Sequence, residues 1–439
     1  MMIIRIFITL VFMHAFSIAY ALPEIQTWMT KQGVKVMYVN APELPMVDIA
    51  LTFDAGSARD DQLPGLSVLT HALVNQGSEK LSADDIASRF EDVGAQFSAS
   101  VNLDRSSVSL RSLSKKEWFD KALDLYIQVI TKPSFPERDF ERERNRMLVG
   151  LEDNKQRPAS IVSEAFYKAL YKKHPYANNS SGTEESLNAI KLKDIRTFHK
   201  NHFVSKNAVL SIVGDIDRKQ VESIANKISK ALPAGKKLKD IPTVKPATPL
   251  TEDIVFPSQQ AHVRIGMIGI ERGNPDYFNL YVGNNILGGG GFTSRLVEEV
   301  RSKRGLSYSV YSYFIPYREP GPFMLGLQTR SDQAQEAIEV CRDVIKDFVE
   351  NGPTREELEL SKQSISNGFP LRIDSNRDIL GYLSMIGYYK LPLTYLDDFR
   401  KNMEAVSLED VRRAFKKHVN VEDLVTVVVG SEQAPPASE

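Results

Sequence analysis

The side chains that could bind a metal are few in this sequence. Its 439 residues include seven histidines and a single cysteine, Cys341, which excludes a cysteine-based zinc cluster and an internal disulfide. Only His199 and His202 lie close together, and on a helix this spacing would place both imidazoles on one face, where they could chelate a metal. No carboxylate follows them within a helical turn. We therefore interpret the two histidines as structural and assign no metal to this chain.

A second group of chemically capable side chains follows a run of glycines, Gly288–Gly291. Arg301 and Tyr308 stand seven residues apart, and a guanidinium and a phenol held together could stabilise negative charge on a substrate. On residue types alone, a surface arginine and an ordinary strand tyrosine are the simpler interpretation, and it stays open. The glycine run lacks the Lys-Ser/Thr of a phosphate-binding loop, so it favours a helix end with close packing or a hinge.

The overall composition limits the partners. Lys and Arg number 55 against 56 for Asp and Glu, a formal charge of −1, so no strong field attracts nucleic acid or an anionic membrane. Hydrophobic residues make up 42% and charged residues 25%, as in ordinary soluble domains. The lone thiol of Cys341 is expected to be buried.

The first 21 residues differ from the rest. Arg5 is their only charge, residues 6–18 are almost wholly apolar, and Ala19-Tyr20-Ala21 fits a signal-peptidase cleavage pattern. We expect a signal peptide over residues 1–21, a mature protein without a membrane segment, and a periplasmic location. A membrane anchor is the alternative, but the apolar run is shorter than the ~20 residues that span a bilayer.

The remaining chain repeats itself at a nearly constant offset of 216 residues. Three pairs of segments carry the repeat: Val47–Leu51 with Val263–Met267, Leu192–Ile195 with Leu408–Val411, and Ala208–Gly214 with Leu424–Gly430. We therefore predict two homologous halves, residues 22–231 and 253–432, joined by a linker over residues 232–252 that contains several prolines and lysines. Residues 433–439 are expected to form a disordered tail.

Strand and helix patterns do not alternate one by one within each half. In the first half we predict a strand at Val47–Phe53, helices at Gly65–Asn75 and Ala83–Val93, and two strands within Ala95–Leu113. Strands that return beside each other before a run of helices favour an α+β fold over a doubly wound one. Each half is therefore predicted to be an antiparallel-rich sheet with helices packed on one face.

Four strings of residues together point to a known family. The most specific is Leu287-Gly288-Gly289-Gly290-Gly291-Phe292-Thr293-Ser294-Arg295-Leu296, which continues with the segment from Glu299 to Val310. The others are Glu141–Arg144, His174–Tyr176 and Gly182–Ser186. With these strings the chain resembles the pitrilysin/insulinase family of zinc peptidases, the inverzincins, from about Gln26 to Gly430. The resemblance implies that family's pair of α+β halves.

The resemblance also implies where a zinc site would lie. Active members carry H-x-x-E-H on the first helix of the first half, and a distal glutamate completes the metal site. The family frame places Val68, His71 and Ala72 on the three functional positions of the motif, with His71 at the place of the general base. The distal position falls on Gly150, two residues before Glu152. Both zinc-binding histidines are missing, so the resemblance implies a degenerate zinc site and no cofactor in this chain.

For Arg301 and Tyr308 the resemblance implies a role in the second half. In the family this pair binds the substrate carbonyl or the oxyanion of the tetrahedral intermediate. In two-subunit members it acts in trans, with a homologous subunit that carries H-x-x-E-H and zinc. We therefore expect a non-catalytic subunit of a secreted endopeptidase, inactive alone, that forms a heterodimer or self-associates around a closed chamber for peptides.

A peptide substrate would add as a strand to a sheet edge. The resemblance places this edge at Phe97–Val101, with Ser98, Ala99 and Ser100 against the peptide. Small polar residues are also common at ordinary exposed edges. A non-proteolytic peptide-binding or scaffold protein of the same fold is the alternative function, which the presence of Arg301 and Tyr308 disfavours. A self-sufficient hydrolase is a third, which the missing zinc ligands disfavour.

Overall fold

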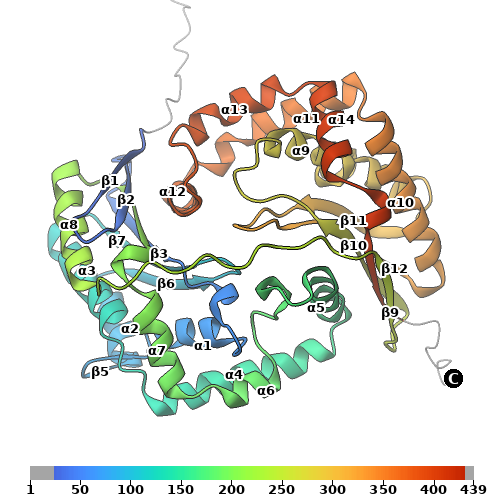
Figure 1. Cartoon of the computed structure of the whole chain (residues 1–439). Helices are drawn as coiled ribbons and strands as arrows, with labels where there is room; N and C mark the ends of the chain where they lie inside the picture. The colour runs from blue at the N-terminus through green and yellow to red at the C-terminus, as the bar shows by residue number, and fades with distance from the viewer. Residues whose placement is uncertain (1–23, 431–439) are drawn as a thin grey trace, which may run out of the picture.

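Two β-sheets of the same design form the centre of the computed structural model, which describes residues 24–430 (Figure 1). The first contains β1 (Gln26–Met29), β2 (Lys35–Asn40), β3 (Met46–Phe53), β6 (Gln96–Val101), β7 (Ser106–Leu113) and β8 (Ala208–Gly214). The second contains β9 (Leu250–Ile254), β10 (Gln260–Ile268), β11 (Ser307–Phe314), β12 (Pro322–Arg330) and β13 (Val425–Val429). A short hairpin of β4 (Gly77–Ser78) and β5 (Leu81–Ser82) lies apart from both.

The strand orders of the two sheets correspond. The first sheet has the order β1-β2-β8-β3-β7-β6, and the second, written from the same end, has the order β9-β13-β10-β12-β11. Apart from the added β1, each strand of one sheet therefore has its counterpart in the other. The pairs β2–β8 and β9–β13 are parallel, and all other pairs in the two sheets are antiparallel. The predicted α+β fold with two homologous halves is confirmed.

Helices follow in the same order in both halves. The first half has α1 (Leu66–Leu73), α2 (Ala83–Glu91), α3 (Lys116–Thr131), α4 (Glu137–Lys155), α5 (Pro158–Tyr171), α6 (Glu184–Ala189), α7 (Leu192–His202) and α8 (Arg218–Ala231). The second has α9 (Tyr277–Asn284), α10 (Ala334–Asn351), α11 (Arg355–Gly368), α12 (Asn376–Tyr389), α13 (Tyr395–Ala405) and α14 (Leu408–His418). The helices and strands that we predicted between residues 47 and 113 agree with β3, α1, α2, β6 and β7.

One helix from each half packs on the sheet of the other half. Helix α12 packs on β2, β3 and β8 of the first sheet, and α5 packs on β10 and β13 of the second (Figure 1). The predicted helices on one face are thus joined by a helix from the other half on the opposite face. Because both faces are covered, every residue of the central strands β8 and β13 is buried, as their near-continuous apolar sequences require.

A buried carboxylate joins the halves where they meet. Asp104, between β6 and β7, is only 3% exposed. Its Oδ2 accepts hydrogen bonds from the Tyr389 hydroxyl at 2.7 Å and from the backbone N–H of Arg318 at 2.8 Å, and its Oδ1 accepts one from the Tyr176 hydroxyl. The Tyr388 hydroxyl donates to the carbonyl of Asp104 at 2.6 Å. The two halves therefore share one polar cluster as well as two exchanged helices.

The segment between the halves lies along this seam. Its first part is held by the first half, since Ser205 N donates to the carbonyl of Pro233 at 2.9 Å and the Arg59 guanidinium donates to that of Lys239 at 2.7 Å. Leu250–Glu252, which we assigned to the linker, begin strand β9 because the segment pairs in parallel with β13. The predicted signal peptide and C-terminal tail lie outside the described residues. Within residues 24–430, no helix is long and apolar enough to cross a bilayer. Cys341 is fully buried, as expected, and burial raises its pKa to about 12.

Candidate functional site

The degenerate zinc positions lie on α1 and α4, which pack against each other. Helix α1 starts at Gly65, whose φ of +95° suits glycine, and the Asp60 carboxylate accepts hydrogen bonds from Gly65 N and Ser67 N at 2.8 Å each. Val68 and Ala72 are one turn apart and are both partly exposed. They therefore share the face on which two histidines would bind zinc, but neither can donate an electron pair.

His71 is turned into the protein. It is 5% exposed, and its Nε2–H donates to the carbonyl of Ser107 on β7 at 3.1 Å. Burial, together with the nearby His199, lowers the pKa of His71 to about 4. The imidazole is therefore neutral and committed to the backbone, which does not fit a general base that faces a substrate.

Gly150 supplies no ligand but leaves room for one. A Cβ built on this glycine of α4 would have no heavy atom within 4 Å. Glu152, two residues on, pairs with Lys155 at 2.6 Å and is exposed. The groups at the four positions therefore do not fit zinc, and we derive no metal chemistry in this chain.

The pair His199 and His202 does not form a metal site either. His199 Nε2 bonds the carbonyl of Ile130 at 2.8 Å, and His202 Nδ1 lies 2.9 Å from the carbonyl of Phe198. Both rings stack on phenylalanines, His199 on Phe203 and His202 on Phe198. Over residues 24–430, no three side chains of His, Cys, Asp or Glu gather in a way that could hold a metal ion.

Arg301 and Tyr308 are brought together by two irregular segments. Arg301 lies in the π-helical turn η6 (Val297–Ser302), a rare conformation that is frequent at functional sites. Tyr308 lies in a β-bulge of the edge strand β11, because Ser307 pairs with Thr329 while Ser309 pairs with the neighbouring Gln328. A bulge re-aims a side chain. The Tyr308 side chain is accordingly 83% exposed.

The guanidinium of Arg301 lies between two aromatic rings. Its central carbon is 4.3 Å from the Tyr308 ring centroid and 4.8 Å from that of Phe292, which is 78% exposed. Within the described residues, the Arg301 guanidinium forms no ion pair and no hydrogen bond with any other group. The Tyr308 hydroxyl likewise forms no hydrogen bond there. Stacking therefore holds Arg301 in place while its N–H groups stay available to an acceptor. The role of Phe292 is not predictable from the sequence, because an exposed aromatic residue next to glycines gives no sign of which cation its ring will cover.

The glycine run fits its neighbours closely. A Cβ on Gly288 would lie 2.4 Å from Ser312 Oγ of β11, and one on Gly290 would lie 2.5 Å from the carbonyl of Asn285. Gly291 has a φ of +65°, which favours glycine. Of the two roles left open, close packing is therefore the one that the structure supports.

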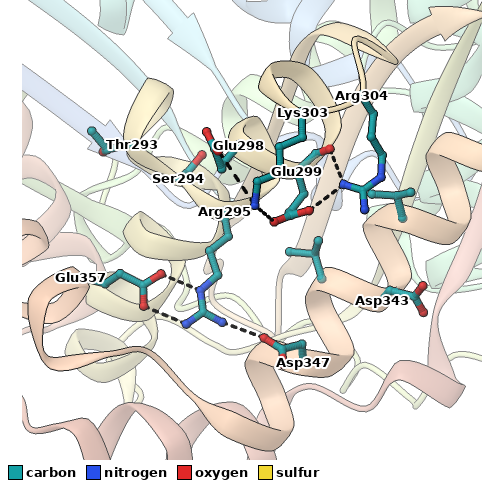
Figure 2. Close-up of a pocket in the computed structure, with 12 residues that line it drawn as sticks. Thr293, Ser294, Arg295, Glu298, Glu299, Lys303, Arg304, Asp343, Asp347 and Glu357 are labelled. Atoms are coloured by element: carbon teal, nitrogen blue, oxygen red, sulfur yellow. Dashed lines mark hydrogen bonds and ion pairs between the residues drawn. The ribbon is translucent and has the colours of Figure 1, made fainter.

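A network of ion pairs holds the base of η6, as Figure 2 shows. Arg295 binds both oxygens of Glu357, at 2.7 and 2.8 Å, and reaches Asp347 at 2.9 Å. Glu299 lies between Lys303 and Arg304, at 2.7 and 2.6 Å. Together with Glu298 and Asp343, these residues line a hollow of about 570 Å³. The ion pairs of Arg295 and Glu299 therefore help to fix the turn that carries Arg301.

The predicted peptide-binding strand is an open edge. Strand β6 ends the first sheet and pairs only with β7, and Ser98, Ala99 and Ser100 are exposed. Helix α1 packs against β6, α4 and α7, whereas β11 packs against β12, α9 and the π-helical turns η4 (Asn285–Gly289) and η6. The edge strand thus adjoins the degenerate zinc positions, and the Arg301–Tyr308 pair belongs to a separate set of elements.

The chain has two homologous α+β halves, and helix α1 lacks the two histidines that would bind zinc. These features define a two-domain inverzincin homologue. Residues 35–184 match the insulinase domain of peptidase family M16, and residues 189–365 match the M16 inactive domain. A crystal structure from Pseudomonas fluorescens, described as a peptidase M16 inactive domain, is 40% identical, covers 94% of this chain and 100% of its own, and superposes with a TM-score of 0.91. The chain belongs to the M16 insulinase family of peptidases.

Two bacterial relatives match over most of their length. The non-peptidase homolog YmxG of Helicobacter pylori is 28% identical over 91% of this chain and 92% of its own. The uncharacterized zinc protease YmxG of Bacillus subtilis is 26% identical over 88% and 94%. A crystal structure of a protease from Helicobacter pylori, 19% identical with a TM-score of 0.83, covers 93% of this chain and 100% of its own and shares the fold.

Proposed function

We propose that this chain is the non-catalytic subunit of a secreted zinc peptidase and that Arg301 and Tyr308 act in trans on a substrate held by a partner. The observation that carries the proposal is the geometry of this pair. A π-helical turn and a β-bulge bring the two side chains together at an edge strand, with their donors available. Both irregularities weaken regular backbone bonding, and a functional role accounts for them.

The chemistry of the pair suits a developing oxyanion. A guanidinium N–H and a phenol O–H that converge on a substrate carbonyl would stabilise the negative charge of a tetrahedral intermediate. In other hydrolases, loss of one such donor lowers kcat by about 10²–10³. The Val68, Ala72 and Gly150 positions supply no ligand, so the partner would have to carry H-x-x-E-H and the zinc.

The partner and the substrate are proposed from the same features. A homologous subunit with intact H-x-x-E-H would face Arg301 and Tyr308 across a chamber, either as a heterodimer or with further self-association of this chain. The open edge of β6 would accept an extended peptide through main-chain hydrogen bonds. Short or unfolded peptides are the substrates that such an edge can bind, and a signal peptide at residues 1–21 would place the pair in the periplasm.

Reconstitution tests the proposal. The chain alone should show no stoichiometric zinc and no peptide cleavage, and adding an H-x-x-E-H subunit encoded beside it should produce cleavage of an unfolded peptide. Arg301→Ala and Tyr308→Phe should each lower kcat of the pair. The matched controls are Arg355→Ala, at an exposed arginine of α11, and Tyr313→Phe, at an exposed tyrosine of β11. Both residues lie outside the stacked pair. Unchanged activity in both site variants would refute the trans role.

A non-proteolytic peptide-binding or scaffold role is the second candidate, and it is favoured by the similarity to the Helicobacter pylori protein named as a non-peptidase homolog. The same reconstitution separates the two functions. A scaffold should bind an extended peptide or a partner while neither Arg301→Ala nor Tyr308→Phe changes any rate.

A further inference from the structure

A cavity of about 530 Å³ lies in the seam between the halves, away from both sites described above. Its walls come from β1, β2 and β8 of the first half, from the segment that links the halves, and from the end of α12. Six basic side chains line it: Lys35, Lys206, Lys237, Arg272, Arg318 and Lys390. Only two carboxylates, Asp54 and Asp240, do so. The cavity is therefore strongly cationic in a chain whose formal charge is −1.

Most of this charge is uncompensated. Arg318 forms an ion pair with Asp54 at 2.8 Å, and Asp54 also pairs with Arg59 at 2.7 Å. The Asp54 charge is therefore shared by two arginines and does not neutralise the other cations of the cavity. The other five basic side chains of the cavity make no ion pair with any described residue. Burial and the charge of Lys390 lower the pKa of Lys35, as expected when two ammonium groups meet without an anion between them.

Arg272 is held ready for a ligand by stacking. Its guanidinium carbon lies 5.6 Å from the centroid of Tyr389 and 5.8 Å from that of Tyr277. Its Nε has no hydrogen-bond partner in the described structure. The Tyr389 hydroxyl is anchored in turn on Asp104 at 2.7 Å. The Arg272 guanidinium is thus held in place without a carboxylate partner. The lysine side chains of the cavity are long and flexible enough to reach an anion bound beside it.

We propose that this seam cavity binds a small anion with several negatively charged oxygens, of the phosphate or polycarboxylate class. Such an anion would lie between Lys35 and Lys390, with Arg272 beside it. The ligand would replace repulsion between unpaired cations by charge-assisted hydrogen bonds. Because its contacts come from both halves and from the linking segment, binding would also tie the halves together. This proposal does not depend on the peptidase function.

The test uses the full chain, with pyrophosphate and citrate as probes. Calorimetric titration should show saturable binding of at least one of them, and that probe should raise the midpoint of thermal unfolding with increasing concentration. Tighter binding of pyrophosphate assigns the phosphate class, and tighter binding of citrate assigns the polycarboxylate class. Absence of saturable binding for both probes would overturn the proposal.

The variant Lys35→Gln/Lys390→Gln should weaken binding by about tenfold or more, since it removes two charge-assisted contacts. Without ligand it should unfold at the same temperature or higher, because it removes a repulsion, so that a lost response cannot be ascribed to misfolding. The control Lys80→Gln/Lys401→Gln changes the net charge equally at exposed lysines outside the cavity. Equal weakening in both double variants would show attraction by net charge alone and would also overturn the proposal.

Discussion

Replacing Asp104 by alanine should destabilise the chain more than any surface substitution. Asp104 is buried, and three donors end on its carboxylate: the hydroxyls of Tyr176 and Tyr389 and the backbone N–H of Arg318. The alanine variant leaves all three without a partner. At about 1–2 kcal/mol for each buried donor that loses its acceptor, the free energy of unfolding should fall by about 3–6 kcal/mol. This is a large part of the 5–15 kcal/mol that is usual for a folded protein.

Equilibrium unfolding in urea, followed by circular dichroism, measures the effect. The conservative variant Asp104→Asn keeps an acceptor at Oδ1 but loses the one that serves Tyr389 and Arg318, so it should lose about two-thirds as much stability as Asp104→Ala. Asp153→Ala removes an exposed carboxylate with no ion pair in the described structure and should change stability by less than about 0.5 kcal/mol. If Asp104→Ala and Asp153→Ala differ by less than about 1 kcal/mol, the buried cluster does not hold the halves together.

Three further predictions concern the candidate sites. Phe292→Ala should lower kcat/KM of the reconstituted peptidase about two- to fivefold without changing the unfolding midpoint, because Arg301 loses one stacking partner; an unchanged kcat/KM would show that Tyr308 alone orients Arg301. The variant Val68→His/Ala72→His/Gly150→Glu should retain about one zinc per chain after dialysis, since the three positions reproduce a zinc ligand set and Gly150 has room for a side chain; a folded variant without zinc would contradict the placement of the degenerate site. Because the pKa of His71 is about 4 when folded and near 6.5 when unfolded, its contribution is present above pH 6.5 and is lost as the pH falls to 4, by about 3 kcal/mol in total; His71→Gln should lose less stability than the native chain over this range in urea titrations at each pH.

The sequence predicted the repeat, and with it the fold, because strand alternation and helix periodicity survive in both halves. It could not predict that α5 and α12 change partners. Their apolar stripes show that each helix is buried on one side, but not which sheet it covers. The fully apolar sequences of β8 and β13 were a usable signal, since a strand buried on both faces needs a second layer. For Asp104, a carboxylate between two strands is typical of an exposed turn, so its burial followed only from the docking of α12.

The candidate site, like the fold, was only partly predictable from the sequence. The spacing of Arg301 and Tyr308 and the family resemblance selected the pair, whereas the bulge at Tyr308 depends on how β11 pairs with β12. The stacking of Phe292 depends on the turn after the glycines. For His71, the resemblance placed the residue at the position of the general base, but its side chain points to Ser107. The local sequence therefore identified which side chains could do chemistry, whereas tertiary contacts determine where those side chains point.

The two sites differ in what the fold requires of them. Helix α1 needs no metal, because Asp60 binds its first N–H groups and Leu69 and Leu73 are fully buried in the core of the first half. Val68 and Ala72 lie on its other, partly exposed face, so the zinc ligands can be absent with little effect on stability. At the second site, a bulge interrupts the ladder and exposes a tyrosine, and a charged guanidinium is held without a carboxylate. These features cost stability, although the buried Ser307 hydroxyl restores hydrogen bonds to Gln328 and Ser309 at the bulge. Functional residues are expected where such a cost persists, which directs experiments on this chain first to Arg301 and Tyr308.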